Sequence, residues 1–460
     1  MKTRLLIRKD LFIISFIILL ILASPLSAQE IRTEPIKGLV DQPISIILSG
    51  FDPSKTVTLR ASMLDDFGKD WTSFAIFEVN KTGIINLSRQ RPIDGTYRDI
   101  DPFGLFWSLD QDPSSKIQGV YRSKTLQPMV INFSAEVDGE TVATKRIERD
   151  FLAAGVKRID VNESGLVGTF FAPDKSMPSP GIIVIGGEDG NLRDDIAGLL
   201  ASHGYAAFAV AYFGRAGLPD EPLNVPLEYF GKAIEWMKTN DAVESDKIGV
   251  IGWSKGGEGA LLIGSTFPDV KAVVSIAGSG VVFQGIARDY HIIKSPWSLN
   301  GKEVPYVRFI ETPLFILQMI TTEISGGPLR LESMFIDSLK NRTATNSAKI
   351  YINRINGPVM IISGEDDGFW PSGQLSKMAS KVRQGSNYSA LDWYLVYPDA
   401  GHNLGIPNLP TTGNCLIMPG NLTLYLGGDP DKDARASADS WNRMLQFLDL
   451  NLMGNGPDSK

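Results

Sequence analysis

Residues 248–260 read Ile-Gly-Val-Ile-Gly-Trp-Ser-Lys-Gly-Gly-Glu-Gly-Ala, an apolar run that ends in the motif Gly252-x-Ser254-x-Gly256. The β-branched residues before the motif predict a strand, and the apolar residues 261–263 after it predict a helix. A serine in so tight a strand-to-helix turn needs glycine on both sides, because a side chain there would clash with the turn. The stretch therefore predicts the nucleophile elbow of a serine hydrolase, although the motif alone also occurs in ordinary loops.

A serine nucleophile needs a base, and the chain contains only three histidines. His203 stands at the predicted end of a helix, where it favours the negative end of the helix dipole, and is interpreted as structural. His291 lies in an irregular segment and is interpreted as a polar contact or a substrate-facing group. His402 follows the predicted strand 393–397, where the last member of the chain order serine, acid, histidine falls. We predict His402 as the base.

Three carboxylates compete for the acid of the triad. They lie in the loop that reads Gly-Glu-Asp-Asp over residues 364–367, directly after the predicted strand 359–363. A carboxylate at this place in the chain can orient the imidazole and stabilise the imidazolium. The spacing favours Asp367, with Asp366 as the alternative, and the remaining acids are expected to cap the next helix or face solvent.

The oxyanion of the reaction needs two backbone donors. The elbow directs the N–H of Lys255 and the start of the next helix toward the developing charge. The second donor is expected from the loop 186–190, whose glycines allow close approach, and we nominate the N–H of Glu188. The side chains of Lys255 and Glu258 are predicted to form a local ion pair that takes no part in proton transfer.

The chain divides into two regions with different periodicity. Residues 29–156 alternate short apolar strands with turns, including the hairpin signal Asp138-Gly139, and predict an all-β immunoglobulin-like sandwich. Residues 157–455 alternate strands with helices and predict an α/β-hydrolase domain with a mostly parallel sheet. Between residues 280 and 349 the alternation is lost to an apolar insertion, which is expected to cover the site or to be a surface excursion.

The start of the chain and its composition suggest a location and exclude several partners. Residues 1–28 combine a basic start, an apolar run and a small-residue cleavage site, and predict a signal peptide and a secreted or periplasmic protein. An uncleaved membrane anchor is the alternative, although the apolar run is shorter than the ~20 residues of a membrane span.

The net charge of −7 argues against a nucleic-acid partner. The single cysteine, Cys415, excludes an internal disulfide, and no metal or cofactor motif is present in the sequence.

Segments in both regions resemble the acyl-CoA thioesterase and bile acid-CoA:amino acid N-acyltransferase family. They include Gly50-Phe-Asp-Pro, Gly95-Thr-Tyr, Ala211-Tyr-Phe-Gly, Gly252-Trp-Ser-Lys-Gly-Gly-Glu, Ser295-Pro-Trp-Ser, Gly364-Glu-Asp-Asp and Ala400-Gly-His. The resemblance implies that Ser254, Asp367 and His402 form the catalytic triad. It also implies hydrolysis, because members that transfer acyl groups to amino acids tend to have cysteine in place of this serine.

We therefore predict a serine-dependent hydrolase that cleaves acyl thioesters through an acyl-enzyme. Its expected partner is a small acyl thioester or ester, and it needs no cofactor or metal. Four alternatives stay open: an exported carboxylesterase, a serine peptidase-like hydrolase on the same triad, an acyltransferase that uses an amino acid, and a non-catalytic binding protein.

Overall fold

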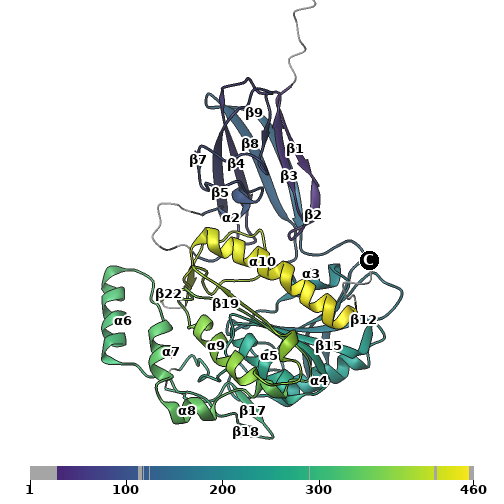
Figure 1. Ribbon diagram of the computed structural model, residues 1–460, viewed down its shortest axis with the longest axis vertical. Helices are drawn as coiled ribbons and strands as arrows, with labels where there is room; N and C mark the ends of the chain where they lie inside the picture. Colours follow the sequence, from purple (N-terminus) through teal and green to yellow (C-terminus); the bar gives the residue numbers. More distant parts are fainter. Residues whose placement is uncertain are drawn as a thin grey trace, which may run out of the picture.

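The computed structural model describes residues 28–454 except 112–116, 118, 124, 290 and 419–421. Residues 1–27, which hold nearly all of the predicted signal peptide, lie outside the described residues. Figure 1 shows a β-sandwich standing on a larger body of sheet and helices, with helix α10 (Pro430–Leu448) at the junction. The predicted fold class, an all-β region followed by an α/β-hydrolase with a mostly parallel sheet, is confirmed.

The sandwich has two sheets, with strand orders β1-β3-β6 and β2-β9-β8-β4-β5-β7. Alternate residues of its strands face the core, as in β4, where Val57 and Leu59 are fully buried. Asp138 and Gly139 have φ of 51° and 88°, as a type I′ hairpin between β8 and β9 requires. The elements of this region are β1 (Glu30–Glu34), β2 (Lys37–Leu39), β3 (Ser45–Ser49), β4 (Thr56–Leu64), β5 (Asp70–Glu78), β6 (Ile85–Asn86), β7 (Asp94–Gly95), α2 (Gly104–Trp107), β8 (Met129–Val137) and β9 (Glu140–Asp150).

The second region is built on one sheet with the strand order β10-β11-β13-β12-β15-β16-β19-β20. Every pair from β13 to β20 is parallel, so the carboxyl ends of these strands meet at one edge. The antiparallel pair β10 and β11 was not predicted, because β10 is exposed at almost every residue and shows no apolar pattern. The strands are β10 (Lys157–Glu163), β11 (Leu166–Ala172), β12 (Ser179–Ile185), β13 (Ala206–Ala211), β15 (Val243–Trp253), β16 (Val270–Ile276), β19 (Val359–Gly364) and β20 (Trp393–Tyr397).

Helices cover both faces of this sheet. One buried apolar cluster joins the sheet to α3 and α10, and a second joins it to α4, α5 and α9. The helices other than α10 are α3 (Asp194–Ser202), α4 (Leu227–Lys238), α5 (Lys255–Thr266) and α9 (Ser372–Arg383).

The insertion contains regular structure that the sequence did not predict. Its helix α6 is apolar around most of its circumference and buries only Phe315, so it has no amphipathic period to read. Phe283 and Phe335 of the insertion pack against Trp370 at ring distances of 6.3 and 5.8 Å. The elements between β16 and β19 are β17 (Trp297–Leu299), β18 (Lys302–Glu303), α6 (Pro313–Ser325), α7 (Glu332–Ser338), α8 (Arg342–Ser347) and the 3₁₀ helix η1 (Ile352–Arg354), and after β20 come β21 (Cys415–Ile417) and β22 (Thr423–Tyr425).

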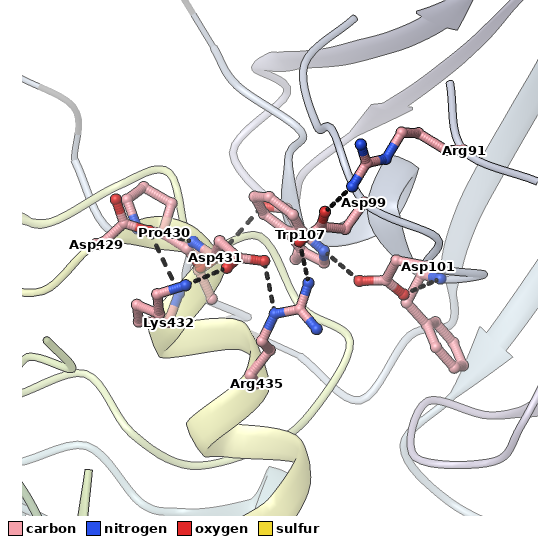
Figure 2. A network of polar contacts seen from close by, with 11 residues as sticks. Arg91, Asp99, Asp101, Trp107, Asp429, Pro430, Asp431, Lys432 and Arg435 are labelled. Carbon is pink, nitrogen blue, oxygen red and sulfur yellow. Dashed lines mark hydrogen bonds and ion pairs between the residues drawn. The ribbon is translucent and has the colours of Figure 1, made fainter. Parts of the chain in front are cut away.

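Polar contacts join the first turns of α10 to the sandwich (Figure 2). Arg435 lies 2.8 Å from Asp431 on its own helix and 3.2 Å from Asp99 of the sandwich. Asp99 in turn pairs with Arg91 at 3.1 Å. In the second half of the helix, the indole of Trp441 donates at 2.9 Å to Asp41 of the sandwich, whose side chain is 3% exposed. Helix α10 thus contacts the sandwich at two places while it packs on the sheet.

A buried arginine fixes the last two strands of the parallel sheet. Arg383, at the end of α9, donates through Nε to Asp392 at 2.8 Å, and both side chains are at most 1% exposed. Its Nη1 donates to the carbonyl oxygens of Ile352 and Ile355 at 2.9 and 3.1 Å. Ile352 and Ile355 lie in the segment that leads into β19, and Asp392 directly precedes β20, so the arginine joins the starts of both strands.

Replacement of Arg383 with methionine should lower the free energy of unfolding by about 3–5 kcal/mol, because it leaves Asp392 buried without its cation. Urea unfolding at neutral pH measures the loss. The matched control is Arg443→Met, which removes an exposed pair with Asp439 and should cost less than about 0.5 kcal/mol. Equal losses in the two variants would contradict this view of the sheet.

Candidate active site

Ser254 occupies the turn between β15 and α5 with φ 56° and ψ −122°, a backbone conformation that non-glycine residues rarely adopt. A Cβ atom on Gly252 would lie 1.9 Å from the carbonyl oxygen of Gly256. A Cβ atom on Gly256 would lie 2.3 Å from the carbonyl oxygen of Gly186. Both flanking glycines are therefore required by the close approach of backbone, as the motif predicts.

The three side chains predicted as a triad form one line of hydrogen bonds. Nε2 of His402 lies 2.9 Å from Oγ of Ser254. Nδ1 of the same ring lies 2.8 Å from Oδ2 of Asp367. Ser254, His402 and Asp367 follow the carboxyl ends of β15, β20 and β19, respectively. Their exposed fractions are only 5%, 2% and 1% in the same order. This arrangement can move a proton from the serine hydroxyl to the imidazole.

The surroundings of His402 are aromatic and tightly bonded. The rings of Phe369, Trp253 and Trp370 lie 5.0, 5.4 and 6.0 Å from the imidazole. The second oxygen of Asp367 accepts the backbone N–H groups of Phe369 and Trp370 at 3.0 and 3.1 Å. These bonds fix the orientation of the carboxylate, so that its other oxygen faces the imidazole.

The other two acids of the loop point elsewhere. Asp366, the alternative candidate, pairs with Arg330 at 2.9 Å. Glu365 pairs with Lys377 at 2.9 Å on the next helix. Of the three carboxylates, only that of Asp367 hydrogen-bonds to the catalytic histidine candidate in the described part of the chain.

The remaining histidines have different surroundings. His203 is the C-cap of α3, and its Nε2 lies 2.6 Å from Asp41 of the sandwich. That hydrogen bond raises the pKa of His203. His291 is exposed, and its backbone N–H donates to Asp289 at 3.0 Å.

One residue that supports the site was not predicted. The buried carboxylate of Asp433, in the first turn of α10, accepts the N–H of Gly401 at 2.7 Å and so holds the loop before His402. Burial raises the pKa of Asp433 to about 8. The signal for this helix was present as the N-cap Asp429 followed by Pro430, which together indicate a helix start.

A buried charge cluster lies beside the nucleophile. Nζ of Lys255 lies 3.3 Å from Glu258, as the predicted ion pair requires, and 3.9 Å from Glu188. Glu258 also accepts the indole N–H of Trp297 at 2.8 Å and the N–H of Phe283 at 3.1 Å. Burial raises the pKa of Glu258 to about 7, and Lys255 partly offsets this effect. The glutamate bonds thereby attach the start of the insertion to the catalytic helix.

The two residues nominated as oxyanion donors belong to segments that border Ser254. Lys255 is the first residue of α5, so its N–H lies at the positive end of the helix dipole. Glu188 belongs to the loop after β12, and a Cβ atom on the neighbouring Gly187 would lie 3.3 Å from Cβ of Ser254. In the described residues, no group of three or more His, Cys, Asp or Glu side chains is arranged to hold a metal ion.

Relatives of known name align with nearly the whole chain. The peroxisomal succinyl-coenzyme A thioesterase of Mus musculus is 28% identical over 432 residues, covering 92% of this chain and 97% of the relative. The mitochondrial acyl-coenzyme A thioesterase 2 of Mus musculus is 28% identical over 419 residues, with coverages of 90% and 87%. The acyl-coenzyme A amino acid N-acyltransferase 2 of Mus musculus is 29% identical over 439 residues, with coverages of 93% and 99%.

These relatives contradict the expected location. The prediction of a secreted or periplasmic protein is wrong, because two relatives that match most of the chain are named as peroxisomal and mitochondrial enzymes. The apolar run of residues 11–23, on which the prediction depended, lies outside the described residues. Within the described part of the chain, no helix has the length and apolarity needed to cross a bilayer.

Two family models match the chain in the order of its two regions. Residues 41–163 match the acyl-CoA thioester hydrolase/BAAT N-terminal region. Residues 225–454 match the BAAT / acyl-CoA thioester hydrolase C-terminal model, which thus spans half of the 460 residues. The resemblance seen in the sequence is confirmed, and the protein belongs to the BAAT / acyl-CoA thioester hydrolase family.

Proposed function

We propose that the protein hydrolyses acyl-CoA thioesters through a covalent acyl-enzyme on Ser254. The observation that supports this most strongly is the 2.9 Å contact between Nε2 of His402 and the serine Oγ, continued by the 2.8 Å contact to Asp367. Thioesterase activity is named for relatives that align with most of the chain. The proposal adds to that activity the nucleophile, the base and the acid.

The first half of the reaction forms the acyl-enzyme. His402 accepts the proton of Ser254 at Nε2 while Oγ attacks the thioester carbon. The carbonyl oxygen becomes an oxyanion, which the N–H groups of Lys255 and Glu188 stabilise. Collapse of the tetrahedral intermediate breaks the C–S bond, and His402 gives its proton to the leaving sulfur, so that the imidazole is neutral again for the second half.

The second half releases the acid. Water loses a proton to His402 and attacks the ester carbon of the acyl-enzyme, and the same two N–H groups stabilise the second oxyanion. Collapse breaks the bond to Oγ of Ser254, which regains its proton from the imidazolium. Asp367 keeps the imidazole in the tautomer that accepts at Nε2 and stabilises the imidazolium in both halves.

The nucleophile favours hydrolysis over transfer to an amino acid. The transferase alternative rests on the relative named as an N-acyltransferase. Ser254 supports hydrolysis, because transfer in this family tends to depend on cysteine at this position, and the one cysteine of the chain is Cys415 in β21. Analysis of the acyl product with and without added glycine or taurine separates the two, since hydrolysis yields free acid in both cases and transfer yields an N-acyl amino acid when the acceptor is present.

The Ser254→Ala variant should lose thiol release from a long-chain acyl-CoA by about 10⁴-fold or more, because the nucleophile and its covalent step are gone. A thiol reagent measures the release, with an aryl ester assayed beside it. Wild-type protein that cleaves the ester but releases no thiol would contradict the proposal and favour a carboxylesterase. A variant that retains wild-type thiol release would exclude Ser254 as the nucleophile.

The Asp367→Asn variant should lower kcat by about 10⁴-fold, because an amide favours the wrong imidazole tautomer. The matched control is Asp366→Asn one residue earlier, whose carboxylate bonds to Arg330 instead. Its kcat should stay within about threefold of wild type, since the hydrogen bond to the base is intact. The reverse order of the two effects would assign the acid to Asp366.

A further inference from the structure

The single hydroxyl hydrogen of Tyr212 is shared between two backbone carbonyl oxygens. The hydroxyl lies 3.1 Å from the carbonyl oxygen of Gly186 and 3.1 Å from that of Gly187. These are consecutive residues of the loop that carries Glu188. The tyrosine follows β13 directly, is 3% exposed and reaches this loop from the neighbouring strand. The proposed reaction assigns it no role.

The geometry of the peptide group gives these bonds a consequence. In a planar trans peptide the C=O and the following N–H point in opposite directions. A donor that holds the carbonyls of Gly186 and Gly187 on one side therefore turns the N–H groups of Gly187 and Glu188 toward the other side. Consecutive N–H groups that point the same way form a concave anion-binding surface. The loop lies against the nucleophile, because a Cβ on Gly187 would lie 3.3 Å from Cβ of Ser254.

We propose that Tyr212 is a positioning residue of the oxyanion hole, which directs the N–H of Glu188 toward the oxyanion formed on Ser254. The inference rests on the proposed function, because it needs a tetrahedral intermediate at Ser254. On this proposal Tyr212 stabilises the transition state and has no effect on the affinity for substrate.

The surroundings keep the phenol in place and protonated. The ring packs against Trp297 and Phe230 at 5.5 and 5.8 Å, and Trp297 is itself held by its indole bond to Glu258. Burial, with the nearby carboxylates of Glu188 and Glu258, holds the pKa of Tyr212 well above its ordinary value. The hydroxyl therefore stays a donor throughout the working pH range. The charge cluster of Lys255 and Glu258 is thus connected to both nominated donors. Lys255 carries the first donor on its own backbone, and Glu258 holds Trp297, which packs against Tyr212.

The test is Tyr212→Phe, which removes the hydroxyl and retains the packed ring. The variant should lower kcat by about 10- to 100-fold and leave KM within about twofold, since only the charged transition state loses stabilisation. The matched control is Tyr229→Phe, a second internal tyrosine that donates to the carbonyl oxygen of Ala211 at 2.6 Å. It should leave both constants within about twofold.

A second measurement reads the oxyanion hole without turnover. An alkyl trifluoromethyl ketone adds to Ser254 to give an anionic hemiketal, whereas the matching alcohol binds without a charged oxygen. Tyr212→Phe should weaken the ketone by the same factor as kcat and leave the affinity for the alcohol unchanged. Replacing Tyr212 with 4-aminophenylalanine, which retains a ring donor, should restore part of both losses.

The outcomes separate this inference from the proposed function. Wild-type protein without Ser254-dependent thiol release would overturn both. Active wild-type protein with equal kcat in the Tyr212→Phe and Tyr229→Phe variants, and with equal ketone affinities, would overturn the role of Tyr212 alone. If Tyr212→Phe lowers the melting temperature but leaves kcat unchanged when it is normalised to the concentration of active serine, the role of Tyr212 is purely structural.

Discussion

The left-handed backbone of Ser254, with φ of 56°, is the constraint on which the site depends. A non-glycine residue in such a conformation costs about 1–3 kcal/mol, so the surrounding structure has to impose it. Here the serine N–H donates to the carbonyl oxygen of Ile276 at 2.8 Å, and Gly252 and Gly256 let the turn close. The turn places Oγ at the edge of the sheet where β19 and β20 deliver the acid and the base. Each of the three groups follows the carboxyl end of a parallel strand by at most five residues, so they meet at one edge of the sheet.

Buried charge is the second determinant of this region. Lys255 and Glu258 are fully buried and the side chain of Glu188 is 14% exposed; burial of such ions is costly unless they are paired and hydrogen-bonded. Their hydrogen bonds and ion pairs join the parts that surround the nucleophile. Glu258 bonds to the start of the insertion and to the indole of Trp297, and Lys255 pairs with Glu188 of the loop after β12. A site enclosed in this way has a low effective dielectric, and backbone dipoles stabilise an oxyanion more strongly there than in water. The same residues therefore contribute both to the electrostatics of the site and to its architecture.

The sequence predicted those parts of the fold that local chemistry determines. The elbow around Ser254 and the apolar strands of the sheet could be predicted, because glycine spacing and β-branched runs are local signals. The exposed β10 and the evenly apolar α6 have no such signal, since neither alternates buried with exposed residues. The link from Glu188 to Lys255 could not be predicted, because it joins segments far apart in the chain. The predicted location was wrong for another reason: residues 1–28 fit an export pattern that the relatives contradict.

The central claim is that an acyl group passes through Ser254. It is tested most directly by intact-protein mass spectrometry after rapid acid quenching of the wild-type protein mixed with a long-chain acyl-CoA, followed by peptide mapping. The account predicts a mass increase equal to the acyl group, located on the peptide that contains Ser254, and its absence in Ser254→Ala. Thiol release without any acylated peptide, or with the acyl group on Cys415 or another residue, would contradict it.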